Sequence, residues 1–179
     1  MRVIAGSARG VPLVAPRDRG TRPITDRVKE TLFAILGDRV PGSRFLDAYA
    51  GSGAIGIEAL SRGADSVDFV ERAGPALVAL RANLAKTRLG DAAAVHALEV
   101  ERFLAAPAGA PWTLAVLDPP YETRAIVAPL QALVPRLAAD ATVVLKHFWR
   151  TEIPDIDHLV PVRQRRFGET MLTFLEVTA

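Results

Sequence analysis

Short apolar runs alternate along the chain with longer stretches whose apolar residues recur at helical spacing. The runs typical of buried strands are residues 44–50, 66–71, 93–98, 112–117 and 142–148. The stretches between them predict helices over residues 54–62, 75–88, 99–105 and 125–138. Because strands that alternate with helices pair in parallel through right-handed crossovers, this order predicts an α/β fold with a mainly parallel sheet.

The two ends of the chain depart from this alternation. MRVIAG and PLVAP predict one or two short strands in an arm rich in Gly, Arg and Pro, followed by a helix over residues 25–36 that ends at Gly37. Residues 158–167 and 169–178 predict two strands joined tightly at Gly168, a hairpin that adds an antiparallel strand to one sheet edge. We therefore expect a basic arm or hairpin over residues 1–22 and one domain over residues 23–179.

Length and composition narrow the class of protein. With 179 residues, half of them hydrophobic, the chain is long enough for one domain with a sizeable core. It has no apolar run of membrane-spanning length, and its start is too interrupted by Arg and Gly for a signal peptide, so we expect a cytoplasmic protein. Cysteine is absent, and His96, His147 and His158 lack ligand spacing, so we expect no metal site.

Basic residues gather near the start of the chain. Residues 1–44 hold nine Arg or Lys and four Asp or Glu, whereas the remaining 135 residues hold 13 basic and 16 acidic side chains. A basic arm on a slightly acidic body favours an anionic partner such as nucleic acid. Compositional bias is the alternative, because Arg supplies 19 of the 22 basic residues.

A glycine-rich loop follows the first predicted strand of the alternating region. In DAYAGSGAIG, Gly51, Gly53 and Gly56 match G-x-G-x-x-G between a strand and a helix. Glu71 ends the next strand, 20 residues after Gly51, where an acid can bind the hydroxyls of an adenosine ribose. This pattern fits NAD, FAD or S-adenosylmethionine, and a glycine turn without a ligand is the alternative.

Asp47 favours one of these ligands. Dinucleotides place a pyrophosphate at the helix N-terminus, and an aspartate four residues before Gly51 would repel it. S-adenosylmethionine has no phosphate and carries two cationic groups, so an acid stabilises it. An aspartate that only caps the loop is the alternative.

The stretch LAVLDPPYET ends an apolar run with an acid and two prolines. Ligands of open α/β sheets bind beyond the carboxyl ends of the strands, so Asp118, Pro119, Pro120 and Tyr121 are candidates for the catalytic site. Asp118 and the Pro119 carbonyl would accept the two N–H bonds of an exocyclic amine, and Tyr121 would stack on the base. A simple strand-ending turn, with Tyr121 in the core, is the alternative.

With D-A-Y-A-G-S-G and D-P-P-Y, the chain resembles the Rossmann-like class I S-adenosylmethionine-dependent methyltransferases. The opening MRVIAGSARG, RPITDRVKETLF and the closing FGETMLTFLEV make it similar to the RsmD-type 16S ribosomal RNA guanine-N2 methyltransferases of bacteria. The resemblance implies a seven-stranded sheet whose last hairpin inserts antiparallel. It also implies S-adenosylmethionine as cofactor and, as partner, 16S rRNA within a partly or fully assembled small ribosomal subunit.

The resemblance also implies a set of site residues. The cofactor contacts would be Asp47, Ala50, Gly51, Ser52, Gly53, Glu71, Arg72, Glu99 and Val100. The contacts to RNA phosphates would be Arg9, Arg17, Arg19, Arg22, Arg27, Lys29, Arg165 and Arg166. Three positions depart from the family. Glu99 stands where an Asp usually meets the adenine amine, and Ala8 stands where an aromatic residue often follows the opening Gly-x. Lys146 replaces a frequent Glu, where a basic group fits a phosphate.

Other functions remain open at this point. Because D-P-P-Y recognises an amine and not a particular base, adenine-N6 methylation of DNA or RNA is the first alternative. Cytosine-C5 methylation ranks low, since that chemistry normally uses a cysteine nucleophile. A nicotinamide-dependent oxidoreductase and a non-catalytic RNA-binding assembly factor are the alternatives from other classes.

Overall fold

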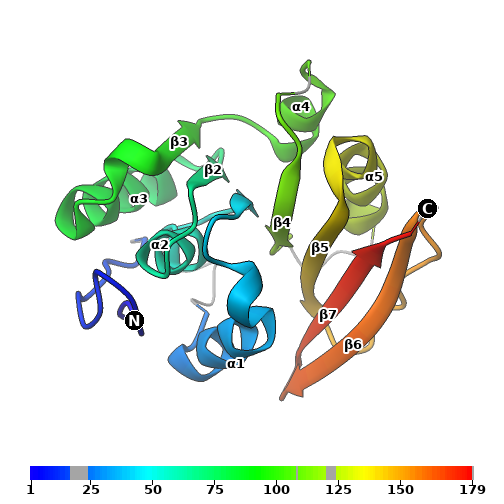
Figure 1. Ribbon diagram of the computed structural model, residues 1–179, viewed down its shortest axis with the longest axis horizontal. Coiled ribbons are helices and arrows are strands. Elements are labelled where there is room, and N and C mark those ends of the chain that lie inside the picture. Colours follow the sequence, from blue (N-terminus) through cyan, green and yellow to red (C-terminus); the bar gives the residue numbers. More distant parts are fainter. Residues whose placement is uncertain (17–23, 108, 120–123, 179) are drawn as a thin grey trace.

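The computed structural model of the chain describes residues 1–16, 24–107, 109–119 and 124–178. Within them, seven strands form one sheet in the order β3-β2-β1-β4-β5-β7-β6 (Figure 1). The strands are β1 (Arg44–Ala48), β2 (Ser66–Val70), β3 (Ala93–His96), β4 (Trp112–Leu117), β5 (Leu137–Phe148), β6 (Leu159–Phe167) and β7 (Thr170–Val177). The helices are α1 (Asp26–Leu36), α2 (Ala54–Ser61), α3 (Gly74–Thr87), α4 (Val100–Ala105) and α5 (Arg124–Leu133), with single 3₁₀ turns at Gly37–Arg39, Gly90–Ala92 and Val134–Arg136.

The pairing of the strands confirms the predicted sheet. The first five strands pair in parallel, β7 lies antiparallel to β5, and β6 lies antiparallel to β7 at the sheet edge. Gly168, with φ +59°, makes the turn between β6 and β7, as expected. The alternation of strands and helices and the C-terminal antiparallel hairpin are therefore both confirmed.

Apolar side chains cover both faces of the sheet. On one face, α1, α2 and α3 pack through residues such as Phe33, Ile57 and Leu80 against alternate strand residues that include Phe45 and Val116. On the other face, α4 and α5 pack against the intervening strand residues, among them Leu46, Ala115 and Leu117. This three-layer arrangement explains the continuous apolar runs, because parallel strands buried on both faces have little room for polar side chains. No helix in the described ranges is long and apolar enough to span a membrane.

The main difference from the predicted elements lies between α5 and β5. The helix expected over residues 125–138 ends at Leu133, a 3₁₀ turn follows, and β5 begins at Leu137 instead of residue 142. Leu137 pairs with Trp112 of β4, and a bulge separates this pair from the next one, Leu114 with Thr142. Local apolar spacing does not distinguish helix from strand here, and the pair of Leu137 with Trp112 places the start of β5 beside β4.

The N-terminal segments form an isolated bridge where one or two short strands were expected. Arg2 and Pro12 make this antiparallel bridge, and the Val3 N–H donates to Val11 O while the Leu13 N–H donates to Met1 O. A longer ladder does not form, because Pro12 has no N–H to donate. The segment is nevertheless anchored, since Val3 and Leu13 belong to the core that packs against α1 and α2.

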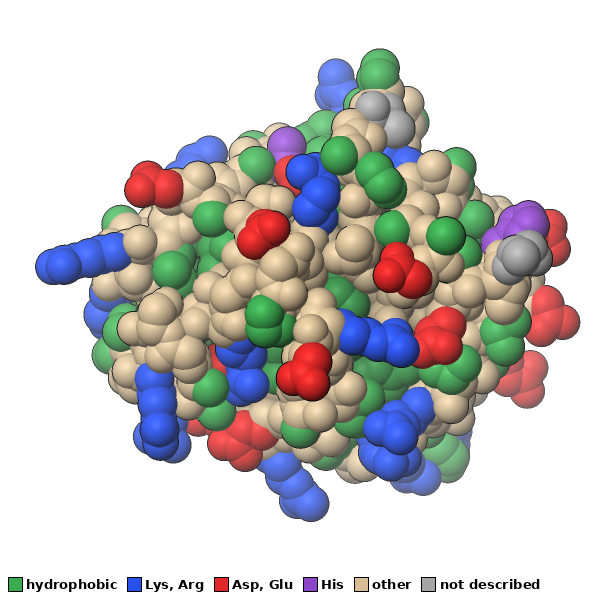
Figure 2. All heavy atoms as spheres, in the orientation of Figure 1, with side chains coloured by type: hydrophobic (Ala, Val, Ile, Leu, Met, Phe, Trp, Pro, Cys, Tyr) green, Lys and Arg blue, Asp and Glu red, His purple; other side chains and the backbone are tan. Residues whose placement is uncertain are grey.

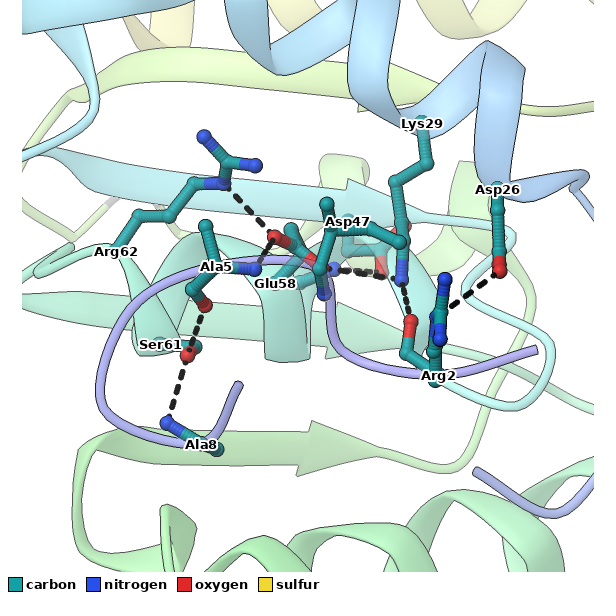
Figure 3. A network of polar contacts seen from close by, with 11 residues as sticks. Arg2, Ala5, Ala8, Asp26, Lys29, Asp47, Glu58, Ser61 and Arg62 are labelled. Atoms are coloured by element: carbon teal, nitrogen blue, oxygen red, sulfur yellow. Dashed lines mark hydrogen bonds and ion pairs between the residues drawn. The ribbon is translucent and has the colours of Figure 1, made fainter. Parts of the chain in front are cut away.

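A buried carboxylate anchors the same segment to α2 (Figure 3). Glu58 of α2 accepts hydrogen bonds from the Ile4 N–H at 2.8 Å and the Ala5 N–H at 3.0 Å. The Lys29 ammonium of α1 lies 3.1 Å from Glu58 Oε2, with both side chains fully buried, and it also donates to Arg2 O. Arg62 Nε adds a fourth contact at 2.8 Å. One carboxylate therefore joins the N-terminal segment, α1 and α2.

We predict that Lys29→Met destabilises the fold strongly, because it leaves the Glu58 charge buried with fewer partners. Breaking a buried ion pair costs about 3–5 kcal/mol, and the free energy of unfolding in urea measures it. The control is Arg2→Ala, which removes a mostly exposed partner of Asp26 and should cost at most about 1 kcal/mol. Equal, small losses for the two variants would contradict the prediction.

Candidate active site

The loop after β1 begins the candidate site at the carboxyl ends of the parallel strands. Gly51 and Gly53 have φ values of +56° and +77°, a left-handed backbone that favours glycine. A Cβ added at Gly51 would meet nothing within 4 Å, so the loop is open on that side. At Gly53 an added Cβ would clash with the Leu80 side chain of α3 and lie 3.3 Å from Ile57, so that side of the loop is closed by packing.

Three polar side chains fix the shape of this loop. The Glu71 carboxylate at the end of β2 accepts from the Gly51 N–H at 2.8 Å. The buried Asn83 of α3 donates to Ser52 O at 3.0 Å. Its side-chain amide also accepts from the Val14 N–H and donates to Val14 O. Asp47 of β1 accepts from the Gly56 N–H at 2.8 Å. Asn83 is the residue that the sequence interpretation missed, since a single Asn in a helix gives no signal of this role.

Asp47 is a loop-holding residue in this structure. Its side chain is buried, and the hydrogen bond to Gly56 occupies an N–H in the first turn of α2. Burial raises the pKa of the Asp47 carboxyl well above its usual range, and the nearby Asp118 and Glu71 charges add to this effect. A pyrophosphate at the start of α2 would have to compete with this internal carboxyl for the Gly56 N–H.

The remaining candidate cofactor residues surround the loop. Glu71 also accepts from the Arg72 and Ala73 N–H groups, and the Arg72 guanidinium pairs with Glu99 at 2.7 Å on the surface. Ala50 and Val100 are buried, so of these two residues only backbone groups and small apolar surfaces can face a ligand. The structure thus brings the ends of β1, β2 and β3 together, as expected.

Asp118 lies at the end of β4 on the other side of the β1 loop. Its carboxylate receives two hydrogen bonds from the Lys146 ammonium of β5, each 2.7 Å long. The Lys146 side chain is 7% exposed and that of Asp118 is 25% exposed. The expectation that Lys146 meets a phosphate is therefore not supported, because its ammonium points at Asp118. The adjoining Pro119 is buried.

The basic residues assigned to RNA contacts fall into two groups. Arg9, Arg27, Arg165 and Arg166 are exposed. Lys29 is a correction, because its fully buried ammonium pairs with Glu58 and cannot reach a phosphate. No local pattern predicts this burial, since Lys29 lies in a stretch of mixed charge and its buried partner is 29 residues away.

A second feature that the sequence interpretation missed is an arginine–tryptophan cluster directly after β5. The Arg166 guanidinium lies 3.7 Å from the ring centre of Trp149, and that of Arg150 lies 4.7 Å from it. The Trp149 N–H donates to Glu169 O in the β6–β7 turn, so the cluster lies at the same end of the sheet as Asp118. An aromatic ring at the surface can stack on a base, and Arg side chains beside it can contact phosphates.

Some predicted residues lie outside the described ranges: Arg17, Arg19, Arg22, Pro120 and Tyr121. Among the residues that are described, no group of three or more His, Asp or Glu side chains gathers as a metal site would require.

A surface hollow lined by Arg39, Ser43 and Thr113 lies at the amino ends of β1 and β4, away from this site.

Comparison with known proteins identifies the family. A profile of the family described as conserved hypothetical protein 95 matches residues 1–176. The chain belongs to this family. YlbH of Bacillus subtilis (strain 168), provisionally named as an rRNA methyltransferase, is 38% identical in an alignment of 175 residues that covers 95% of each chain. The ribosomal RNA small subunit methyltransferase D of Escherichia coli (strain K12) is 40% identical over 121 residues, 68% of this chain and 60% of the relative.

Solved structures agree with the membership in the conserved hypothetical protein 95 family. The Escherichia coli protein yhhF, provisionally named as a methyltransferase, superposes with a TM-score of 0.89 at 30% identity, over 99% of this chain and 97% of that one. These findings confirm the RsmD-type resemblance and the Rossmann-like class I fold. The chain is a methyltransferase enzyme.

We predict that Gly56→Ala destabilises the loop and α2. An added Cβ would lie 2.7 Å from Phe69 Cζ and 2.8 Å from Val67 Cγ1, both in buried side chains of β2. Overpacking of this kind costs about 1–3 kcal/mol, which thermal or urea unfolding measures. Gly74→Ala is the matched control, because a Cβ at that helical position meets nothing within 4 Å. A Gly56→Ala variant as stable as Gly74→Ala would show that α2 is not packed this closely.

Proposed function

We propose that this enzyme transfers a methyl group from S-adenosylmethionine to the exocyclic N2 amine of a guanine in 16S rRNA of the small ribosomal subunit. The observation that carries the proposal is the position of Asp118, a carboxylate that directly follows β4 beside the glycine loop of β1. The small subunit methyltransferase D of E. coli, 40% identical where it matches, supports the rRNA substrate.

The residues present fit S-adenosylmethionine. The loop is open at Gly51 and is flanked by the carboxyl groups of Glu71 and Asp47, a suitable surrounding for a cationic ligand without phosphate. Glu71 would bind the ribose hydroxyls with the acceptor capacity that its three N–H partners leave. Arg72 and Glu99 would border the adenine, and Ala50, Ser52, Gly53 and Val100 would line the ligand. When bound, S-adenosylmethionine supplies an electrophilic methyl group.

Asp118 and its neighbours would prepare the amine. The Asp118 carboxylate and the Pro119 carbonyl would accept its two N–H bonds, so that the nitrogen lone pair points toward the methyl group. Asp118 would also stabilise the positive charge that develops on the nitrogen, and the surplus proton would leave to Asp118 or to water. Pro120 would keep the backbone rigid and Tyr121 would stack on the base; both lie outside the described residues.

The RNA would approach along the end of the sheet that carries Asp118. On the face drawn in Figure 2, Lys and Arg side chains are dispersed and alternate with Asp and Glu, so charge density alone does not mark a binding patch. Arg165 and Arg166 are the strongest described candidates, because Arg166 is held by Gly168 O and by Trp149 at that end of the sheet. Arg9, Arg27 and the undescribed Arg17, Arg19 and Arg22 would extend the contact.

The first test is transfer of labelled methyl from S-adenosylmethionine to naked 16S RNA, to small subunits that lack the modification, and to duplex DNA. We expect N2-methylguanosine on RNA or subunits, and a loss of about 100-fold or more in Asp118→Asn. This variant keeps the shape of the side chain, and Asp65→Asn, an exposed site before β2, is the control. Label on adenine, on cytosine or on DNA alone would overturn the substrate assignment, and no transfer at all would favour a non-catalytic RNA-binding factor.

A second prediction concerns RNA affinity. Arg165→Ala with Arg166→Ala should weaken RNA binding and lower its salt dependence by roughly 0.7 in slope per lost phosphate contact, with unchanged cofactor affinity. Arg81→Ala with Lys86→Ala removes the same charge from exposed positions of α3, near the opposite sheet edge, and should have no such effect. Equal weakening by both pairs in a salt titration would mean that only net charge matters.

A further inference from the structure

Lys146 and Asp118 are brought together by the register of two central strands. Leu117 of β4 pairs with Leu145 of β5, so the next residues of both strands lie at the same level. Asp118 and Lys146 come two residues after Val116 and Val144, whose side chains face α1–α3. Because side chains alternate along a strand, Asp118 and Lys146 lie on that same face of the sheet. On its other side, Lys146 pairs with Leu172 of β7. The position of the lysine is therefore set by three paired strands.

We propose that Lys146 is a positioning residue for methyl transfer, which holds the Asp118 carboxylate in the orientation that receives the target amine. The proposal rests on the proposed role of Asp118 in the transfer. The ammonium reaches the carboxylate from the closed side, since the Lys146 side chain is 7% exposed whereas that of Asp118 is 25% exposed. Asp118 therefore keeps an accessible side while both of its oxygens are held.

Hydrogen-bonding capacity agrees with this division of roles. A carboxylate has about four lone-pair sites, and the two bonds from Lys146 use one site on each oxygen. Sites for an N–H of the amine therefore remain. A protonated lysine has donors and no lone pair, so it can orient Asp118 but cannot accept the N–H of the amine in its place.

The lysine also keeps Asp118 in the form that accepts hydrogen bonds. Burial raises the pKa of the Asp118 carboxyl, and the charge and hydrogen bonds of Lys146 act to lower it. Among the described residues, Asp47 of β1 also faces this pair, and the Asp118 charge raises the pKa of Asp47. Without Lys146, the effect of burial on the Asp118 pKa would be unopposed by the lysine, and Asp118 would bind a proton at higher pH.

The decisive measurement needs no substrate. In protein labelled with ¹³C at aspartate carboxyls, and with Asp118→Asn used to assign the signal, the Asp118 carboxyl is followed through a pH titration. We expect its titration to move upward by about one pH unit or more in Lys146→Met and to stay near the wild-type position in Lys146→Arg. Lys86→Met, at an exposed position of α3, is the matched control. An unchanged Asp118 titration in Lys146→Met would overturn the proposal.

Kinetics then separate a positioning role from a purely structural one. Lys146→Met should lower kcat by about ten- to hundredfold with unchanged cofactor affinity, and the acid limb of kcat should move to higher pH. Lys146→Arg should restore the acid limb. In the Asp118→Asn background, Lys146→Met should add little further loss, because a residue that acts through Asp118 is not additive with it.

Each other outcome is informative. A higher kcat in Lys146→Met would show that the pair inhibits the enzyme, and reduced cofactor affinity with normal kcat would assign Lys146 to the ligand; both overturn the proposal. If Lys146→Met does not fold, as judged by circular dichroism, Lys146→Gln carries the same expectation, because it removes the charge and keeps a donor. A wild-type enzyme without methyl transfer contradicts the proposed function instead, and the carboxyl titration still decides the role of Lys146.

Discussion

The buried carboxylate of Glu58 is the contact on which the arrangement around α2 depends. It bonds the backbone of the N-terminal segment and the ammonium of Lys29, so it connects parts of the chain that are more than 50 residues apart. The helix that carries Glu58 begins at the glycine loop, and Asp47 holds its first turn to β1. Contacts at both ends of α2 therefore hold the glycine loop in place, and a shift of the N-terminal segment would displace that loop.

The site itself follows from the position of β1 in the sheet. The chain passes from β1 to β2 on one side and reaches β4 on the other, so the loop after β1 lies where the strand order changes direction. Acidic groups lie on the β2 side, at Glu71 and around Glu99, whereas the β4 side carries an acid neutralised by a lysine. These charges therefore suit the proposed cationic cofactor on the β2 side and the proposed neutral amine on the β4 side.

Much of the fold and part of the site were predictable from local pattern. The glycine loop, Glu71 and Asp118 are close to one another because each directly follows a parallel strand, and strand ends can be recognised from sequence. Asn83 and the Trp149 cluster were not predicted, because their partners lie on other elements. Lys29 was misassigned for the same reason: a lysine in a helix of mixed charge gives no sign that its partner, Glu58, is buried beside it.

The sequence by itself determined the α/β alternation, the antiparallel hairpin and the residues at the strand ends, because periodicity and turn residues are local properties. Tertiary structure decided where β5 begins, since Leu137 joins the sheet through its pair with Trp112 of β4. It also decided the environments of the charged groups. Whether a lysine meets solvent, Glu58 or Asp118 depends on register and packing between distant segments, and no spacing within one element records that.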